Sequence, residues 1–477
     1  MAHALLIDFG STYTKLRCVD LDAGRVVGSA QGPSTVTTDV TVGLDAALAN
    51  LDRGLGGLPD FTHRLASSSA AGGLKMVTIG LVPELTAKAA RLAALGAGAK
   101  LAGAYSFELT NSDIAAIVAG RPDMVLLSGG TDGGNHRVIA HNAARLAESA
   151  LACPVVVAGN RSVADDVYDL LSGAGKTVIV TENVMPRHLE LNIEPAREAI
   201  RQLFIRHIVH AKGIDKAAGR LDAVLMPTPA AVLKGAGLLA DGTEATPGLG
   251  PLVVVDIGGA TTDVHSICSG APSASGVVYH GLPEPYAKRT VEGDLGMRHT
   301  ARQVVEAIGA AAFAADVGWA EADVEAMLAA IEADIERLPA SDAERAFDAA
   351  LAGAATRLSV TRHAGTHETV YAATGPVTMQ RGKDLGEVGL VIGTGGVLVH
   401  AMDPAAILGA ALATADAPLS LRPRAARLML DYDYALYACG LLAEVAPEAA
   451  LAVGKAGLHD IIDEPREDGG HGTAATQ

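Results

Sequence analysis

Residues 5–15 (LLIDFGSTYTK) and 252–266 (LVVVDIGGATTDVHS) decide the fold of this chain. Each begins as a run of apolar residues and continues with an aspartate, a glycine and small hydroxyl residues, which predicts a buried strand that ends near Asp8 or Asp256. Glycine lets the backbone approach an anion closely, and clustered backbone N–H groups bind phosphate. A carboxylate at the same point can hold the cation that accompanies a phosphate, usually through water. Two such stretches predict two similar domains that face each other across one nucleotide.

These stretches resemble the phosphate-1 and phosphate-2 loops of the actin-like ATPase superfamily, which includes actin, a class of heat-shock chaperones and the sugar kinases. A third stretch, residues 391–396 (VIGTGG), resembles the adenosine loop of that superfamily and follows in the expected order. By itself this stretch is more typical of a glycine-rich turn after a strand. The resemblance implies an α/β protein with duplicated RNase H-like (actin-like ATPase) domains that bind ATP and Mg²⁺.

Longer segments narrow the resemblance to one family. They are residues 128–135 (SGGTDGGN), 155–160 (VVVAGN), 182–186 (ENVMP), 226–233 (MPTPAAVL), 289–298 (RTVEGDLGMR) and 362–365 (RHAG). Together with residues 256–266 they resemble the accessory proteins of adenosylcobalamin-dependent glutamate mutase (methylaspartate mutase), which are also found with related aminomutases. The resemblance covers nearly the whole chain and implies an ATPase in a chaperone role, which reactivates the mutase or exchanges its damaged cofactor. Its implied partners are mutase subunits and ATP.

The resemblance also implies roles for individual residues. Asp8 and Asp256 would face each other across the cleft and position Mg²⁺, mostly through water. Lys15 would neutralise the β- and γ-phosphates, although the same lysine is equally typical of an exposed strand position. The other residues implied to bind the nucleotide are Gly10, Ser11, Thr12, Gly258, Gly259, Thr261, Thr262, Gly393, Thr394, Gly395 and Gly396.

Three acidic residues are the candidates for catalysis: Asp256, Asp263 and Glu292. Asp263 would help to orient the metal or the attacking water. Glu292 lies in a segment for which a solvated surface loop is the ordinary interpretation, but the superfamily places an acidic or amide residue near the attacking water at a comparable point. Phosphoryl transfer needs mainly positioning and charge neutralisation, so a slow ATPase requires no strong base.

Composition limits the class of partner. The chain has 477 residues, enough for two to four domains, and its net charge is −17. Such an acidic chain repels nucleic acid and anionic membranes, so neither is an expected partner. Hydrophobic residues make up 49% of the chain and aromatic residues only 3%, which indicates a core of alanine, valine, leucine and isoleucine.

Cysteine and histidine spacing gives no sign of a metal or disulfide framework. Cys18, Cys153, Cys268 and Cys439 form no C-x-x-C pair, so we interpret them as buried thiols of a cytoplasmic protein. The histidine pair at 363 and 367 is more typical of core or interface residues than of a metal site. The chain enters a strand at once, so we expect no signal peptide. It also has no apolar stretch of about 18 residues, so we expect no membrane span.

The domain organisation is predicted from changes in the pattern of apolar strands and helices along the chain. Residues 4–30 predict strands joined by hairpin turns, and from residue 74 five apolar strands alternate with helices, which is typical of a doubly wound parallel sheet. Glycine-rich loops after three of those strands indicate either tight turns or a surface for a ligand or partner. We expect a first ATPase domain over 1–73 and 186–250, an inserted flavodoxin-like domain over 74–185, a second ATPase domain over 251–403, C-terminal helices that pack back on the first domain over 404–462, and a flexible tail over 463–477.

Two other functions remain open from the sequence. One is a small-molecule kinase of the same superfamily, which needs an aspartate base facing a substrate pocket and has no stronger candidate than Asp263 or Glu292. The other is a non-catalytic actin-like scaffold, against which the strong acidity argues mildly. A homodimer is also left open.

Overall fold

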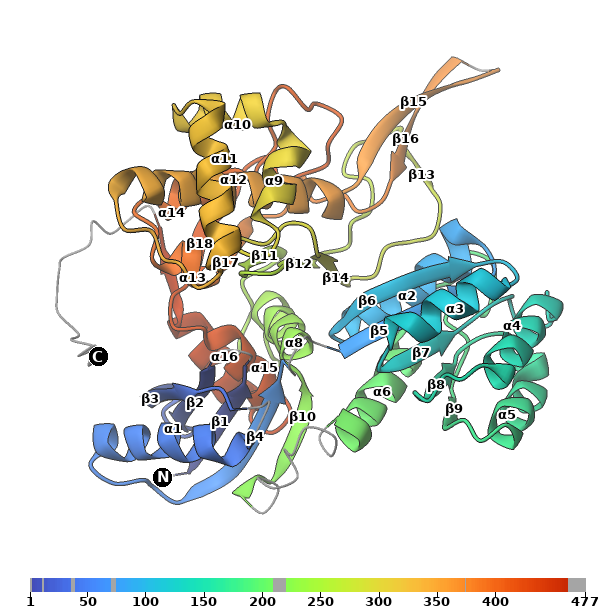
Figure 1. The fold of residues 1–477 in the computed structure, drawn as a ribbon, viewed down its shortest axis with the longest axis horizontal. Helices are drawn as coiled ribbons and strands as arrows, with labels where there is room; N and C mark the ends of the chain where they lie inside the picture. Colours follow the sequence, from blue (N-terminus) through green and yellow to red (C-terminus); the bar gives the residue numbers. More distant parts are fainter. Residues whose placement is uncertain are drawn as a thin grey trace.

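The computed structural model describes residues 2–10, 13–35, 39–69, 74–208, 220–373 and 375–461 and shows a mixed α/β protein (Figure 1). The described strands form four sheets, one of them entirely parallel and three mixed. The α/β class that the sequence predicts is therefore confirmed.

The first sheet has the strand order β10-β4-β1-β2-β3, in which β1, β2 and β3 are antiparallel neighbours and β4 and β10 run parallel to β1. Strand β1 is buried on both faces: Leu5 and Ile7 pack against α1, and Ala4 and Leu6 belong to the core around α8. Side chains alternate between the faces of a strand, so burial on both sides explains the unbroken apolar run. The elements are β1 (His3–Phe9), β2 (Tyr13–Asp20), β3 (Arg25–Pro33), α1 (Val40–Leu55), β4 (Phe61–Ser68), β10 (Ala223–Pro227) and α8 (Thr228–Asp241).

The second sheet, of order β14-β12-β11-β17-β18-β19, repeats this topology with one added strand. Strands β11, β12 and β14 are antiparallel neighbours, β17 and β18 run parallel to β11, and β19 is the antiparallel addition. Asp8 and Asp256 are each the last residue but one of the equivalent strands β1 and β11. The strands are β11 (Leu252–Ile257), β12 (Thr262–Ile267), β14 (Ala287–Glu292), β17 (Leu390–Thr394), β18 (Arg427–Asp431) and β19 (Leu458–Asp460).

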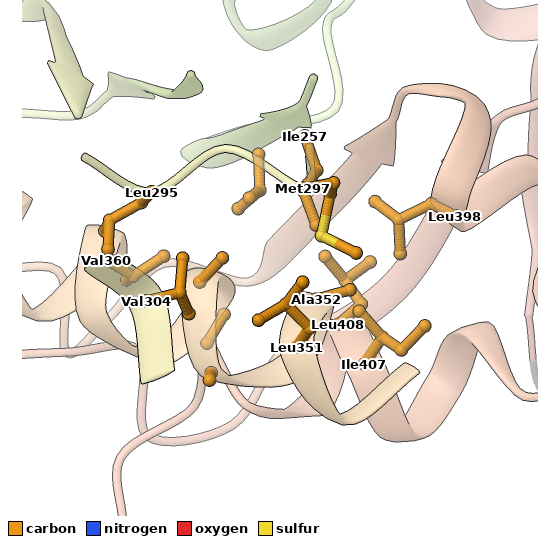
Figure 2. Packing of buried hydrophobic residues seen from close by; sticks show 14 of the residues in the cluster. Ile257, Leu295, Met297, Val304, Leu351, Ala352, Val360, Leu398, Ile407 and Leu408 are labelled. Carbon is orange, nitrogen blue, oxygen red and sulfur yellow. The ribbon is translucent and has the colours of Figure 1, made fainter. Parts of the chain in front are cut away.

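Helices cover one face of the second sheet and form the largest described core with it. Figure 2 shows Leu351 and Ala352 of α12 packed towards Met297, with Ile407 and Leu408 of α14 beside them. The helices are α9 (Ala301–Ile308), α10 (Ala310–Val317), α11 (Glu321–Ala333), α12 (Asp342–His363), α13 (Gly396–Val399) and α14 (Pro404–Gly409).

A separate parallel sheet lies between β4 and β10 in the sequence, with the strand order β6-β5-β7-β8-β9. Apolar clusters fill both of its faces, as the continuous apolar strands require. Its elements are β5 (Leu74–Gly80), η1 (Pro83–Ala87), α2 (Lys88–Gly96), β6 (Ala99–Ser106), α3 (Asn111–Gly120), β7 (Met124–Leu127), α4 (Arg137–Glu148), β8 (Val155–Val157), η2 (Arg161–Val163), α5 (Ala164–Gly173), β9 (Val178–Val180), α6 (Glu194–Leu203) and η3 (Phe204–Ile208). In space this unit meets the second sheet, where α2 contacts β14 (Figure 1).

A small fourth sheet has the order β13-β16-β15, and its β15–β16 hairpin projects from the body of the protein (Figure 1). The strands are β13 (Val278–His280), β15 (Thr366–Ala372) and β16 (Gly375–Arg381).

The expectation of C-terminal helices over residues 404–462 that pack back on the first domain is corrected in part by the structure. Within this segment, β18 joins the second sheet and α14 packs into the core of that sheet. The helices α15 (Ala435–Leu442) and α16 (Pro447–Ala456) do contact the first sheet, through β1, β4 and β3. Strand β18 is buried between β17, which runs parallel to it, and β19, which runs antiparallel. Its short apolar run (LMLD) is as typical of such a strand as of a helix.

Helices α8 and α15 cross between the first two sheets at a very short distance, which glycine permits. A Cβ atom at Gly440 would lie 1.9 Å from the carbonyl oxygen of Ala231. We therefore expect Gly440→Ala to lower the free energy of unfolding by about 1–3 kcal/mol, because the helices must move apart. The measurement is the midpoint of urea unfolding.

Gly237 of α8 is the matched control for this substitution, because a Cβ atom there would have no neighbour within 4 Å. Gly237→Ala should raise stability by about 0.5–1 kcal/mol through its helix propensity. Equal midpoints for Gly440→Ala and wild type would contradict the close crossing.

Candidate functional site

A cavity of about 490 Å³ lies between the first two sheets and is lined by residues of both. Asp8 and Asp256 line this one cavity, which we call the carboxylate cavity. Its lining residues are Asp8, Gly10, Tyr13, Lys15, Ser69, Thr228, Val232, Asp256, Ile257, Gly258, Thr394, Gly395, Gly396, Asp431, Tyr434, Leu436 and Tyr437.

Asp8 reaches the cavity from β1 and is held by two hydroxyl groups. The Ser67 hydroxyl donates a hydrogen bond of 3.0 Å to its carboxylate, and Thr228 at the start of α8 donates another. Burial raises the pKa of Asp8 above its ordinary value, although the Thr228 hydrogen bond and the nearby Lys15 ammonium act in the opposite direction.

Asp256 enters from the opposite wall and has no such support. Among the described residues, no donor lies within hydrogen-bond distance of its carboxylate. Burial raises the pKa of Asp256 to about 7, and the neighbouring Asp263 carboxylate adds to this rise. A desolvated carboxylate without a donor is stabilised by a cation, and hard divalent cations prefer oxygen ligands.

A third carboxylate, Asp431, lies at the end of β18 and lines the same cavity, although the sequence analysis missed it. It accepts hydrogen bonds from the backbone N–H groups of Ala435 (2.6 Å) and Leu436 (3.2 Å) and so caps α15. Burial raises the pKa of Asp431 to about 6. Its signal was present in the sequence, because residues 428–431 (LMLD) repeat the apolar run with a terminal aspartate seen before Asp8 and Asp256.

Lys15 of β2 lies in the cavity wall and is only partly exposed, so the alternative of an exposed strand position is wrong. Its ammonium nitrogen lies 3.8 Å from the centre of the Tyr434 ring, a cation–π contact. The lysine charge also lowers the pKa values of Asp8 and Asp256 against the larger effect of burial.

The glycine loops bring backbone close to the cavity. Gly395 has φ +104°, and a Cβ atom there would lie 2.3 Å from the carbonyl oxygen of Ile257, so only glycine fits. The N–H groups of Gly10 and Gly258 donate within their own turns, to the carbonyl oxygens of Tyr13 (3.1 Å) and Thr261 (2.9 Å). Ser11 and Thr12, which we expected to bind phosphate, lie outside the described residues.

Several predicted site residues do not line the carboxylate cavity. Gly393 is buried inside β17, where a Cβ atom would meet Leu398. The Thr262 hydroxyl is buried and donates 2.6 Å to the carbonyl oxygen of Leu295. Thr261 precedes β12 and also lies outside the lining.

Two of the three catalytic candidates are held by arginines away from the cavity. Asp263 is paired with Arg289 at 2.6 Å, and both side chains are buried. Glu292 is not in a loop but is the last residue of β14, and it accepts 2.8 Å from Arg362. Burial raises the pKa of Glu292 against the effect of that hydrogen bond.

A second, largely apolar cavity of about 670 Å³ adjoins the first and shares Ile257, Gly258 and Gly396 with it. We call it the apolar cavity. A partly buried ion pair of 2.6 Å between Arg298 and Asp348 forms part of its wall. The remaining lining residues are Gly259, Met297, Leu338, Pro339, Asp342, Arg345, Ala346, Ala349, Val397, His400, Ala401, Met402, Asp403 and Ile407.

Other candidate sites are unsupported in the described part of the chain. Within it, no three histidine, cysteine or acidic side chains lie close enough to hold one metal ion directly. His363 is a core residue, because its ring is buried and bonded to the hydroxyl groups of Thr290 and Ser266 at 2.7 Å each. All four cysteines are free thiols. The described helices include none that is long and apolar enough to pass through a bilayer.

Comparison with known proteins gives one family. The family described as "MutL protein" matches residues 4–458. "Protein MutL" of Clostridium tetanomorphum is 48% identical over 452 residues, which are 94% of this chain and 98% of that protein.

Two solved structures match most of the chain, but their TM-scores and sequence identities are low. Xylulose kinase from Bifidobacterium adolescentis has a TM-score of 0.30 and 14% identity, covering 94% of this chain and 92% of its own. ROK hexokinase from Thermus thermophilus has a TM-score of 0.28 and 12% identity, covering 94% and 97%. At these TM-scores, neither kinase carries weight for the function of this chain.

Proposed function

Since this chain belongs to the MutL protein family, we propose that it binds ATP with Mg²⁺, hydrolyses it slowly, and uses it to reactivate an adenosylcobalamin-dependent aminomutase such as glutamate mutase or to exchange its cofactor. The observation that carries the ATP part is the pair of carboxylates, Asp8 and Asp256, which end equivalent strands of two like sheets and line one cavity. The mutase part rests on the resemblance of the sequence segments to mutase accessory proteins.

The chemistry of the carboxylate cavity fits Mg²⁺. The raised pKa values of Asp8 and Asp256 express the cost of burying charge, and a divalent cation removes that cost. These two aspartates would hold the ion, mostly through water, as Mg²⁺ prefers. When bound, the ion neutralises phosphate charge and polarises the phosphoryl group.

The two adjoining cavities fit the two ends of a nucleotide. The carboxylate cavity offers Lys15 and close backbone at Gly395 for the phosphates. The apolar cavity, with Ile257, Met297 and Val397 in its wall, fits a planar base. Because the cavities share Gly258 and Gly396, one ATP molecule can span both.

The pairing of Asp263 and Glu292 with arginines indicates that hydrolysis would be slow. Asp263 and Glu292 are engaged by Arg289 and Arg362, so neither is a free base in the cavity. Positioning of the phosphates by Lys15 and the cavity walls would then be the main source of rate.

The proposal extends to the parallel-sheet unit between β4 and β10. We infer that the parallel-sheet unit is a flavodoxin-like insert in an actin-like ATPase, since its strand order is one of the two common doubly wound orders.

The name MutL is shared with DNA mismatch-repair ATPases, but a net charge of −17 argues against nucleic acid as a partner. We also infer a cytoplasmic location, which the free thiols favour.

Calorimetric titration of the purified protein tests the nucleotide part. We expect ATP to bind in the presence of Mg²⁺ and to bind much more weakly after EDTA removes the metal, because the phosphates would then face unscreened carboxylates. Absence of any Mg²⁺-dependent nucleotide binding would overturn the proposal.

A capture experiment with the purified mutase tests the partner. The amount of mutase that this protein captures should differ with and without ATP. Equal capture under the two conditions, or no capture under either, would reject the mutase role.

A further inference from the structure

Tyr434 has an unusual backbone conformation at the edge of the carboxylate cavity. It immediately precedes α15 and has φ +52°, in the left-handed region. This region is unfavourable for a bulky side chain and persists only where the surroundings impose it. Such positions are concentrated at functional sites, so the contacts of the Tyr434 ring are candidates for a functional role.

Two cations of the first sheet hold the turn that carries Tyr434. The Lys15 ammonium lies over the Tyr434 ring at 3.8 Å. Arg17, two residues further along the same face of β2, donates a hydrogen bond to the carbonyl oxygen of Asp433. The turn itself follows β18 of the second sheet, so these contacts bridge the two walls of the cavity.

The contact with the Tyr434 ring is what holds the Lys15 ammonium in place. Among the described residues, that ammonium makes no hydrogen bond and no ion pair within 4.0 Å. Asp8 and Asp256 act on it only through their charges. The lysine side chain has four rotatable bonds, and without a contact its ammonium would occupy many positions.

We propose that Tyr434 is a positioning residue for nucleotide binding: its ring holds the Lys15 ammonium at the wall of the carboxylate cavity, where it meets the β- and γ-phosphates. A pre-positioned cation loses less conformational entropy when the phosphates arrive, so affinity rises. The gain applies to phosphates beyond the first, because the base and ribose contact the apolar cavity instead. This inference rests on the proposed binding of ATP.

The experiment compares three nucleotides by calorimetry in the presence of Mg²⁺. Tyr434→Leu should weaken ATP and ADP binding by about 3- to 30-fold, the range of a partly buried cation–π contact, and leave AMP binding unchanged. Tyr434→Phe keeps the aromatic face and should recover most of the lost affinity. Lys15→Met should show the same selective loss, and combining it with Tyr434→Leu should add little.

Tyr432→Leu is the matched control, because Tyr432 lies two residues earlier, packs edge-on against His459 and does not line the cavity. It should bind all three nucleotides as wild type does. The inference is overturned if Tyr434→Leu keeps its ATP affinity, if it loses AMP affinity equally, or if Tyr434→Phe is as weak as Tyr434→Leu. A wild-type protein that binds no nucleotide overturns the proposed function instead, so the two failures are distinguishable.

Discussion

Asp256→Ala is expected to abolish Mg²⁺-dependent ATP binding and to lower any ATP hydrolysis by about 10²–10³-fold, since a metal ion contributes several kcal/mol to stabilising phosphoryl charge. The reason is that Asp256 is a half-buried carboxylate of the cavity for which the described residues provide no hydrogen-bond donor, so it depends on a cation. The measurements are calorimetric titration with and without Mg²⁺ and the steady-state release of phosphate. Asp60→Asn, an exposed aspartate of the same protein, is the control and should change neither.

Replacing Asp256 should have the opposite effect on stability: we expect the substitution to stabilise the nucleotide-free protein at high pH. The unfolded Asp256 carboxyl ionises near 3.8, whereas in the folded protein it keeps its proton to about 7. The folded state therefore binds more protons, and the stability of the nucleotide-free protein should fall as pH rises from about 4 to 7. Asp256→Asn removes this loss, so the variant should be more stable than wild type at pH 8 and not at pH 4. Thermal unfolding at the two pH values decides between this result and an ordinary destabilising substitution.

Asp263→Ala is expected to lower the free energy of unfolding by about 3–5 kcal/mol, because it leaves the Arg289 guanidinium buried and unpaired. The Arg289 side chain is 3% exposed and that of Asp263 is 12% exposed. Arg289 also donates to the carbonyl oxygens of Leu95 (3.0 Å) and Ala99 (2.9 Å), at the end of α2 and the start of β6. The pair therefore fastens the parallel-sheet unit to the second sheet.

Urea unfolding of single and double variants checks this role. Replacing both partners, as in Asp263→Leu with Arg289→Met, should cost less than the sum of the single changes, because no charge is left unpaired. The control is Glu325→Ala, which removes an exposed ion pair with Arg302 and should leave the midpoint unchanged. An Asp263→Ala protein of wild-type stability that has lost only ATP hydrolysis would instead support the catalytic role expected from the sequence.

The sequence anticipated those parts of the site that depend on short stretches of chain. Asp8 and Asp256 could be found because an apolar run, an aspartate and a glycine are local features that predict a strand and its end. The same reasoning would have found Asp431, had residues 428–431 been interpreted as a strand. No helix was predicted over α12, the 22-residue helix that follows the Ser341 N-cap, because an alanine-rich segment with scattered charges has weak periodicity.

Roles that depend on partners distant in the sequence were beyond that reasoning. Asp263 was expected to help orient the metal or the attacking water, but its carboxylate is paired with Arg289 of the neighbouring strand. Glu292 was expected in a loop, but pairing with β12 extends the strand to include it. In both cases the partner is set by strand register, which single residues do not reveal.

By itself the sequence determined the α/β class, the two strands that end in aspartates and the acidic character that disfavours nucleic acid, because apolar runs, turn residues and net charge act locally or by simple addition. Only the tertiary structure decided that Asp8 and Asp256 share one cavity, that Asp431 joins them and that Tyr434 lies against Lys15. The physical reason is that these relations arise where two sheets and the helices between them pack together, and packing brings together residues whose separation along the chain carries no signal of their contact.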